Sequence, residues 1–188
     1  MTILPKENRD FKWSVIKDNF LSQEECDNLK KHIKSTCKNY GYIPEGIQWK
    51  SILYNKGEET DYQWLVDRAY VNFKIANNLY WKFDIEDITN STGLYYPNGE
   101  HGGDYTLHSD FANGEDETGI NGTTHKITGI VFLNDDFDGG ELEILKGKVE
   151  SKTGRLVMYP SFAAHRPLKY SGADRFVVMF TIEGDCFV

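Results

Sequence analysis

The spacing of apolar residues near the amino terminus predicts an amphipathic helix. Cys26, Leu29 and Ile33 recur at helical spacing and would form one buried stripe. Ser22 stands just before them and Glu25 follows it by three residues, which is the spacing of a capping box. In that motif the serine hydroxyl accepts a bond from the helix, and the glutamate accepts one from the serine amide. The pattern therefore predicts a helix capped by Ser22.

Two further segments follow in the first half of the chain. A second helix is predicted over residues 61–80. The residues expected to supply its buried faces are Trp64, Leu65, Ala69, Val71, Phe73, Ile75 and Ala76. Between the helices, residues 41–60 contain Gly41, Pro44 and Gly46, so this stretch is expected to be a loop with short extended pieces.

After Trp81 the pattern changes to short runs of β-branched and aromatic residues, separated by Gly, Asn and Asp. The predicted strands are 94–96, 126–133, 142–145, 156–159 and 175–182. In the last run, one face carries Arg175, Val177, Met179 and Thr181, and the other carries Phe176, Val178, Phe180 and Ile182. Many short strands with turns between them are typical of a sandwich, jelly roll or barrel.

Length, charge and cysteine content narrow the class of protein. A chain of 188 residues with 39% hydrophobic residues is long enough to bury a core and fits one domain. The net charge of −8 argues against an extensive nucleic-acid surface or contact with an anionic membrane. Three cysteines without CxxC spacing favour reduced thiols. Because neither a signal-peptide core nor an apolar run of about 20 residues is present, a cytoplasmic protein is expected.

His108-Ser109-Asp110 is the first candidate for chemistry. Alternate residues of a strand project from the same face, so His108 and Asp110 can converge on one metal ion. Two histidines and one carboxylate on one side of an ion form the facial triad of non-haem iron(II) oxygenases, because they leave the opposite positions open. By itself the motif is weak, since this chain has five histidines and 29 acidic residues.

His165 is the best candidate for the third ligand. It follows a predicted strand and a turn, which can bring it back beside His108. His32 belongs to the first helix, on another structural unit. His101 and His125 lie in a glycine-rich turn and at a loop edge, where solvated or structural roles are commoner.

Arg175 adds a candidate for co-substrate binding. It begins the last strand, ten residues after His165, on the face opposite the Phe and Val row. A guanidinium that enters a β core needs an anionic partner, and it grips a carboxylate with two parallel hydrogen bonds. A bound dicarboxylate would meet this need. The simpler alternative is an exposed arginine paired with Asp174, and Lys169 is a weaker candidate for the same anchor.

Together these motifs resemble the 2-oxoglutarate and Fe(II)-dependent dioxygenase superfamily, specifically its prolyl 4-hydroxylase-like branch. The resemblance covers about residues 92–182. The segments that carry it, in order, are Tyr96-Pro97-Asn98-Gly99, Tyr105 to Asp110, Phe132 to Leu142 with its Gly139-Gly140-Glu141 turn, Gly154 to Pro160, His165-Arg166-Pro167, and Arg175. The chain departs from relatives at Phe132, where a tyrosine is common, and at Val177, where a serine often follows the arginine.

The resemblance implies a mainly β fold with flanking helices. The expected architecture is a double-stranded β-helix, or jelly roll, with the N-terminal helices packed on one sheet. A single dioxygenase domain would span residues 1–188. Within it, residues 1–85 would supply helical support and substrate loops, and residues 86–188 would form the jelly-roll core.

The resemblance also implies the site residues. His108, Asp110 and His165 would be the metal ligands and the catalytic residues, and Arg175 and Tyr96 would bind 2-oxoglutarate. The implied cofactors are Fe(II) and 2-oxoglutarate, with L-ascorbate as a candidate reductant. Asp110 fills the position that halogenases of this family leave open for a halide, so hydroxylation is favoured over halogenation.

The implied activity is hydroxylation of a substrate C–H bond with 2-oxoglutarate and O₂, giving succinate and CO₂. A prolyl residue of a peptide or protein is the first candidate substrate, and a small molecule is an equal alternative. Residues 41–60 and 111–124 are expected to act as substrate loops. Two other classes stay open: a jelly-roll Fe(II) dioxygenase or isomerase without 2-oxoglutarate, which would not need Arg175, and a metal-free lectin-like binding module.

Overall fold

The computed structural model describes residues 10–43, 46–97, 106–111, 123–145 and 147–185. Within them, the elements are β1 (Val15–Lys17), α1 (Gln23–Thr36), β2 (Lys38–Ile43), β3 (Gly46–Asn55), α2 (Gln63–Ala76), the π-helix η1 (Asn77–Trp81), β4 (Ile88–Tyr96), β5 (Thr123–Phe132), β6 (Phe137–Gly139), β7 (Leu142–Ile144), β8 (Gly147–Val149), β9 (Leu156–Pro160), β10 (His165–Pro167), β11 (Tyr170–Gly172) and β12 (Arg175–Asp185). The chain is therefore mainly β, as expected.

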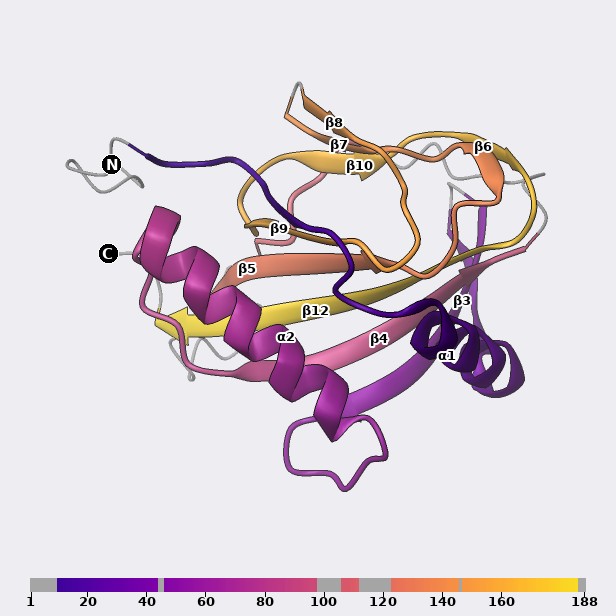
Figure 1. Ribbon diagram of the computed structural model, residues 1–188, viewed down its shortest axis with the longest axis horizontal. Helices are drawn as coiled ribbons and strands as arrows, with labels where there is room; N and C mark the ends of the chain where they lie inside the picture. Colours follow the sequence, from indigo (N-terminus) through magenta and orange to yellow (C-terminus); the bar gives the residue numbers. More distant parts are fainter. Residues whose placement is uncertain (1–9, 44–45, 98–105, 112–122, 146, 186–188) are drawn as a thin grey trace.

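The main sheet is antiparallel and is built around β12 (Figure 1). Its strands, as far as the chain is described, follow the order β1-β9-β5-β12-β4-β3-β2. β12 pairs with β4 on one side and with β5 on the other, so both of its edges are hydrogen-bonded. A side chain at the start of this central strand is therefore carried into the interior of the molecule.

Both α-helices cover one face of the main sheet, and Figure 1 shows α2 lying across β5, β12 and β4. Residues of β12 and of the two helices form one buried cluster that includes Phe176, Val178, Phe180, Ile182, Leu29, Ile33, Leu65, Ala69 and Phe73. Phe73 of α2 meets Phe180 edge to face, with 6.3 Å between ring centroids. The predicted packing of the helices on one sheet and the predicted alternation along the last strand are confirmed.

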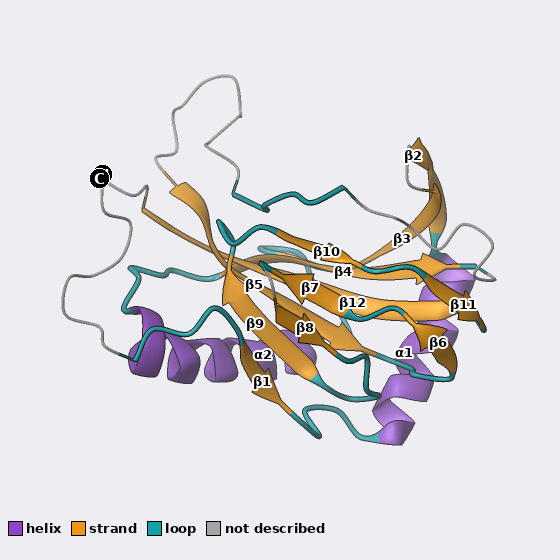
Figure 2. Cartoon of the chain, turned by 90° about the horizontal axis from the view of Figure 1, so that it is seen from above, coloured by secondary structure: helices purple, strands orange, loops and turns teal. Residues whose placement is uncertain are grey.

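A second, smaller sheet covers part of the opposite face (Figure 2). It has the order β10-β7-β8, and β11 pairs with β6 beside it. The buried cluster between the sheets includes Leu94, Ile130, Val157 and Val177 of the main sheet and Leu142, Ile144 and Val149 of the smaller one. Two facing antiparallel sheets form the expected jelly roll.

The first helix forms as its sequence predicts. Ser22 Oγ accepts a hydrogen bond from the amide of Glu25 at 3.2 Å, and the Ser22 amide donates to Glu25 Oε2 at 2.8 Å. Cys26, Leu29 and Ile33 are buried. In the part of the chain that the structure describes, no helix combines the length and the apolar character needed to cross a membrane.

The prediction for the second helix is right in its extent and wrong in part of its packing. Its buried residues include Leu65, Ala69, Phe73 and Ala76. Trp64, Val71 and Ile75 are instead 38%, 52% and 54% exposed. The reason is geometric: apolar residues surround most of this helix, and a helix lying on a sheet can bury only one face.

The expectation of a loop with short extended pieces over residues 41–60 is wrong for most of this stretch, because β2 continues to Ile43 and β3 follows it. β3 runs through Gly46–Asn55 and pairs with β4 from Trp49 to Asn55. The register shifts between Ile52 and Tyr54, and Leu53 and Tyr54 are both buried. This irregularity breaks the alternation of period two that marks a strand in a sequence, so the pattern is hidden.

Candidate metal centre

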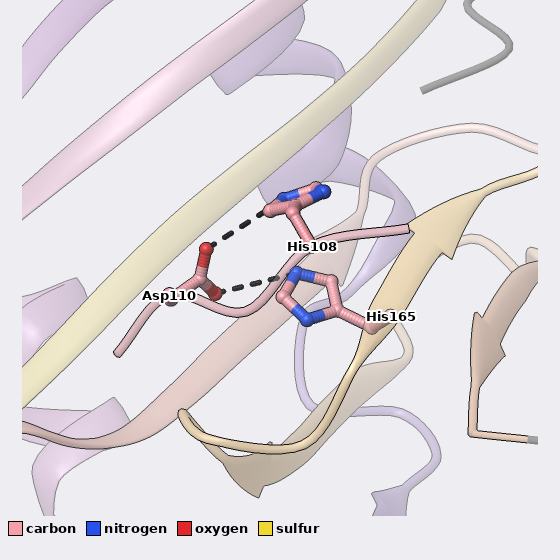
Figure 3. Close-up of side chains that lie close together, drawn as sticks. All are labelled: His108, Asp110 and His165. Atoms are coloured by element: carbon pink, nitrogen blue, oxygen red, sulfur yellow. Dashed lines mark ion pairs between the residues drawn. The ribbon is translucent and has the colours of Figure 1, made fainter. Parts of the chain in front are cut away.

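The three predicted ligand side chains point toward one another (Figure 3). Nε2 of His108 lies 3.8 Å from Oδ1 of Asp110, and Nε2 of His165 lies 3.3 Å from Oδ2. One ligand atom from each side chain lies within 4.8 Å of the others. The His108 amide donates to His165 O at 3.1 Å, and the His165 amide donates to His108 O at 2.8 Å. This isolated bridge, rather than a regular strand, joins the two segments.

Both imidazole rings are oriented by main-chain carbonyls. Nδ1 of His108 lies 2.8 Å from Thr106 O, and Nδ1 of His165 lies 3.0 Å from Ala163 O. A carbonyl can only accept, so each Nδ1 carries a proton, and in the neutral ring the lone pair of Nε2 is directed at the shared centre. Burial lowers the pKa of His165, which favours the neutral imidazole that binds metals.

Asp110 is held by neighbours that the sequence did not single out. Thr128 Oγ1 donates to Asp110 Oδ2 at 2.8 Å, and the Tyr159 hydroxyl lies 3.5 Å from the same oxygen. Burial, followed by the Asp110 charge, raises the pKa of Tyr159, so its hydroxyl stays protonated and can donate. His125, expected to be solvated or structural, lies with Nδ1 2.9 Å from the main-chain oxygen of Asp110. The sequence holds one indication that Thr128 lies at the site. Thr128 and Ile130 are two residues apart in β5 and so share a face of the strand, and Ile130 lines the cavity described next.

A cavity of about 90 Å³ adjoins the three side chains. A single water needs at least about 10–15 Å³ on this scale, so the cavity can hold a small molecule. Its lining residues are Leu94, Tyr96, His108, Asp110, Ile130, Leu142, Tyr159, His165, Pro167, Arg175, Val177 and Met179. All five predicted site residues therefore border one space, although they come from four separate segments.

Arg175 supplies a buried cation to this cavity. The residue is 3% exposed, so the alternative of an exposed arginine is wrong. The Asp174 carboxylate accepts from Lys34 Nζ of α1 at 2.8 Å. Asn134 donates to the Asp174 carbonyl at 2.6 Å and accepts from the Phe176 amide at 2.9 Å, so the main chain is held on both sides of Arg175.

The other candidates lie elsewhere. His32 is on α1, with its ring centroid 4.8 Å from that of Tyr62. Lys169 is exposed and does not line the cavity. His101, Tyr105 and most of the expected substrate loop, residues 112–122, lie outside the described residues.

The donor set fits a divalent transition metal. Two imidazole nitrogens and one carboxylate oxygen suit iron(II), and three ligands on one side leave coordination positions open. In an octahedral ion with bonds of about 2.1 Å, neighbouring ligand atoms lie about 3 Å apart. The three ligand atoms, one from each side chain, lie within 4.8 Å of one another, so side-chain movements of about 2 Å or less would reach this geometry. The same residues therefore fit the metal, and the adjoining cation and cavity fit a small anionic ligand.

One known family matches the part of the chain that contains this site. The family model described as the 2OG-Fe(II) oxygenase superfamily matches residues 92–182, a span that contains all five predicted site residues. No curated protein matches this sequence.

Solved structures of prolyl hydroxylases share the fold. A Pseudomonas putida prolyl-4-hydroxylase is 19% identical, covering 93% of this chain and 94% of its own, with a TM-score of 0.69. A viral collagen prolyl hydroxylase from Paramecium Bursaria Chlorella virus-1, solved as a 2OG complex, is 20% identical, covering 92% and 97%, with a TM-score of 0.65. A Trichoplax adhaerens prolyl hydroxylase, solved with a hypoxia inducible factor peptide fragment, is 16% identical, covering 95% and 85%, with a TM-score of 0.67.

At these identities the structural likeness shows a common fold. The family match also bears on the chemistry of the site. The matched residues include the three candidate metal ligands, Arg175 and the residues that line the cavity. Over residues 92–182 the chain matches the 2OG-Fe(II) oxygenase superfamily, whose cofactors are Fe(II) and 2-oxoglutarate.

Proposed function

We propose that this protein is a hydroxylase that inserts one oxygen atom into a substrate C–H bond, with peptidyl proline as the first substrate to test. The observation that carries the proposal is the convergence of His108, Asp110 and His165 beside a cavity that also contains the buried Arg175. When bound, Fe(II) and 2-oxoglutarate use O₂ to oxidise the substrate, and the co-substrate leaves as succinate and CO₂.

The residues of the chain have separate roles in this proposal. His108, Asp110 and His165 hold the metal on one side, and the carbonyl-bound Nδ1 atoms keep both Nε2 atoms directed at it. Arg175 binds the distal carboxylate of 2-oxoglutarate, because a guanidinium matches a carboxylate with two parallel bonds. Tyr96 is a second contact for the co-substrate from β4. The apolar walls of the cavity limit the access of water to the bound co-substrate.

The shape of the site also bears on the primary substrate. The interior cavity has room for a small co-substrate, so a larger substrate has to meet the metal from outside. The His108 side chain is 39% exposed, and the neighbouring Leu107 is 53% exposed. A peptide lying over this surface could present one side chain to the metal while its backbone stays outside. Because solved structures with this fold include prolyl hydroxylases, proline is the first side chain to test.

An anaerobic titration with Fe(II), followed by 2-oxoglutarate, tests the cofactor assignment against its alternatives. A visible metal-to-ligand charge-transfer band is expected on adding 2-oxoglutarate. Iron binding without this band would favour a dioxygenase or isomerase that does not use 2-oxoglutarate, and lack of iron binding would favour a metal-free binding module. In aerobic assays with proline-containing peptides, mass spectrometry should find one added oxygen atom together with stoichiometric succinate. Asp110→Ala should abolish both products, and undiminished turnover by this variant would rule out the assigned triad.

A further inference from the structure

The Arg175 guanidinium lies near the rings of two tyrosines. Its guanidinium carbon is 5.4 Å from the ring centroid of Tyr96 and 5.9 Å from that of Tyr170. Tyr96 is opposite Arg175 in the pairing of β4 with β12. Tyr170 comes from β11 and is 5% exposed. Contacts between a desolvated guanidinium and aromatic rings are attractive, so both rings restrict where the guanidinium can lie.

The two tyrosines differ in their relation to the cavity. Tyr96 lines it beside the predicted ligands, whereas Tyr170 is absent from the lining residues. The Tyr170 hydroxyl donates to the main-chain oxygen of Tyr96 at 3.0 Å. Tyr170 thus contacts Arg175 without lining the cavity, and its hydroxyl also ties β11 to β4. Among the contacts described here, those to Arg175 and to the main chain of Tyr96 link Tyr170 to the cavity.

The glycine pair of the family motif keeps Tyr170 in place. Gly139 and Gly140 have φ values of 77° and 71°, which favour glycine. A Cβ on Gly140 would lie 2.7 Å from Phe137 Cε2 and 3.1 Å from Tyr170 Cβ, and a Cβ on Gly139 would lie 2.5 Å from Lys169 O. Phe137 packs edge to face on Tyr170, with 5.3 Å between centroids. The two glycines therefore allow the turn after β6 to lie close against the start of β11, where Tyr170 is.

We propose that Tyr170 is a positioning residue that holds the Arg175 guanidinium in the orientation required by a distal carboxylate, and so sets the preference for a dicarboxylate co-substrate. The inference rests on the proposed function. An arginine side chain has many rotamers, and fixing one of them in the free protein removes an entropic cost from binding. Tyr170 provides this restraint from a strand that contributes no metal ligand.

Binding of two ligands tests the inference. 2-Oxoglutarate and 2-oxopentanoate share the 2-oxo acid group, but only the first has a distal carboxylate. Calorimetric titrations of the anaerobic Fe(II)-loaded full chain should show that Tyr170→Leu weakens 2-oxoglutarate about tenfold, as expected from the loss of one desolvated cation–π contact. Binding of 2-oxopentanoate should change by less than about twofold, because it does not use Arg175. Tyr170→Phe keeps the ring and should lose about threefold, from the single hydrogen bond.

Tyr54→Leu is the matched control, since Tyr54 is also a buried tyrosine but belongs to the cluster under the helices. It should lower the unfolding midpoint as Tyr170→Leu does and leave both affinities unchanged. An equal loss for the two ligands in Tyr170→Leu, or unchanged 2-oxoglutarate affinity, would overturn the inference.

A second readout separates failure of the inference from failure of the proposed function. A wild-type protein that shows no preference between the two ligands would contradict the role proposed for Arg175 in binding 2-oxoglutarate. In that case, the side-chain NMR signal of ¹⁵N-labelled Arg175, assigned by its loss in Arg175→Lys, decides the inference. Tyr170→Leu should move this signal in the metal-free protein through the lost ring current, and Tyr54→Leu should not. An unmoved signal would show that Tyr170 does not position Arg175.

Discussion

Thr128 donates a hydrogen bond of 2.8 Å from its hydroxyl to Oδ2 of Asp110. Thr128 belongs to β5 in the main sheet, whereas Asp110 lies in a segment that is tied to the smaller sheet through His108. The bond therefore connects the proposed metal ligand to the rigid part of the fold. Groups that orient a ligand in this way commonly change metal affinity by 10- to 100-fold.

Thr128→Val is expected to weaken Fe(II) binding by about tenfold or more, because the variant keeps the shape of the side chain and loses the donor. The affinity for Fe(II) is measured by an anaerobic titration that is monitored by calorimetry. Thr128→Ser should bind iron like the wild type, since it retains the hydroxyl. Thr128 also lies 2.9 Å from the hydroxyl of Ser161, so Ser161→Ala is needed to separate the two contacts. Equal losses in Thr128→Val and Ser161→Ala would argue against the orienting role.

Metal binding should stabilise the fold, since the three ligands come from two distant segments that a bound ion would join. With free Fe(II) at about 100 times its dissociation constant, the free energy of unfolding should rise by about 2.7 kcal/mol. His165→Ala should remove this increment when thermal unfolding is followed under anaerobic conditions. His32→Ala is the control, because His32 lies on α1, and it should retain the full increment. Equal stabilisation of the two variants would disprove the assigned site.

Stability should also depend on pH through Glu25, which accepts from both Arg68 nitrogens, at 3.0 Å and 2.8 Å, and from the Ser22 amide. These bonds, chiefly that from Arg68, lower the pKa of Glu25. A carboxyl group with a lowered pKa contributes stability above its unfolded pKa of about 4.3, and this contribution is lost as the pH falls through the folded value. Glu25→Gln should therefore cost up to about 1 kcal/mol at pH 7, mostly through the weakened pair with Arg68, because a glutamine can still accept from the Ser22 amide.

The difference between Glu25→Gln and the wild type should shrink as the pH falls below about 4. Urea unfolding between pH 7 and the lowest pH at which both proteins still fold measures this trend. Glu24→Gln, at an exposed position in the same helical turn, should change the stability by less than about 0.5 kcal/mol at every pH. A cost that is constant with pH would contradict the ionic contribution.

Gly129 is required for the contact between α2 and the main sheet. A Cβ at this position would lie 2.3 Å from Cζ of Phe73, which is fully buried. Gly129→Ala should therefore lower the free energy of unfolding by about 1–3 kcal/mol, measured by urea titration. Gly147→Ala is the matched control, because the nearest atom to its Cβ would be Ile144 O at 3.6 Å. Equal free energies of unfolding for Gly129→Ala and Gly147→Ala would contradict the prediction. They would mean that α2 can move away from β5 without a loss of stability.

Local patterns predicted those parts of the fold that depend on neighbours in the chain. The capping box of Ser22 and Glu25 needs only a spacing of three residues, and it forms as predicted. The alternation from Arg175 to Ile182 correctly separated the face under the helices from the face toward the cavity. β3 was missed because its bulge at Ile52 to Tyr54 interrupts the alternation on which the prediction depends.

The sequence by itself determined the chemical types of the candidate site: two histidines, a carboxylate and an arginine at spacings that resemble one family. Only the tertiary structure decided which side chains surround them. Thr128, His125 and Tyr159 reach Asp110 across strands, and Tyr170 reaches Arg175 from the separate pair of β6 and β11. These contacts depend on strand pairing between residues far apart in the chain, and no local periodicity records which strands become neighbours.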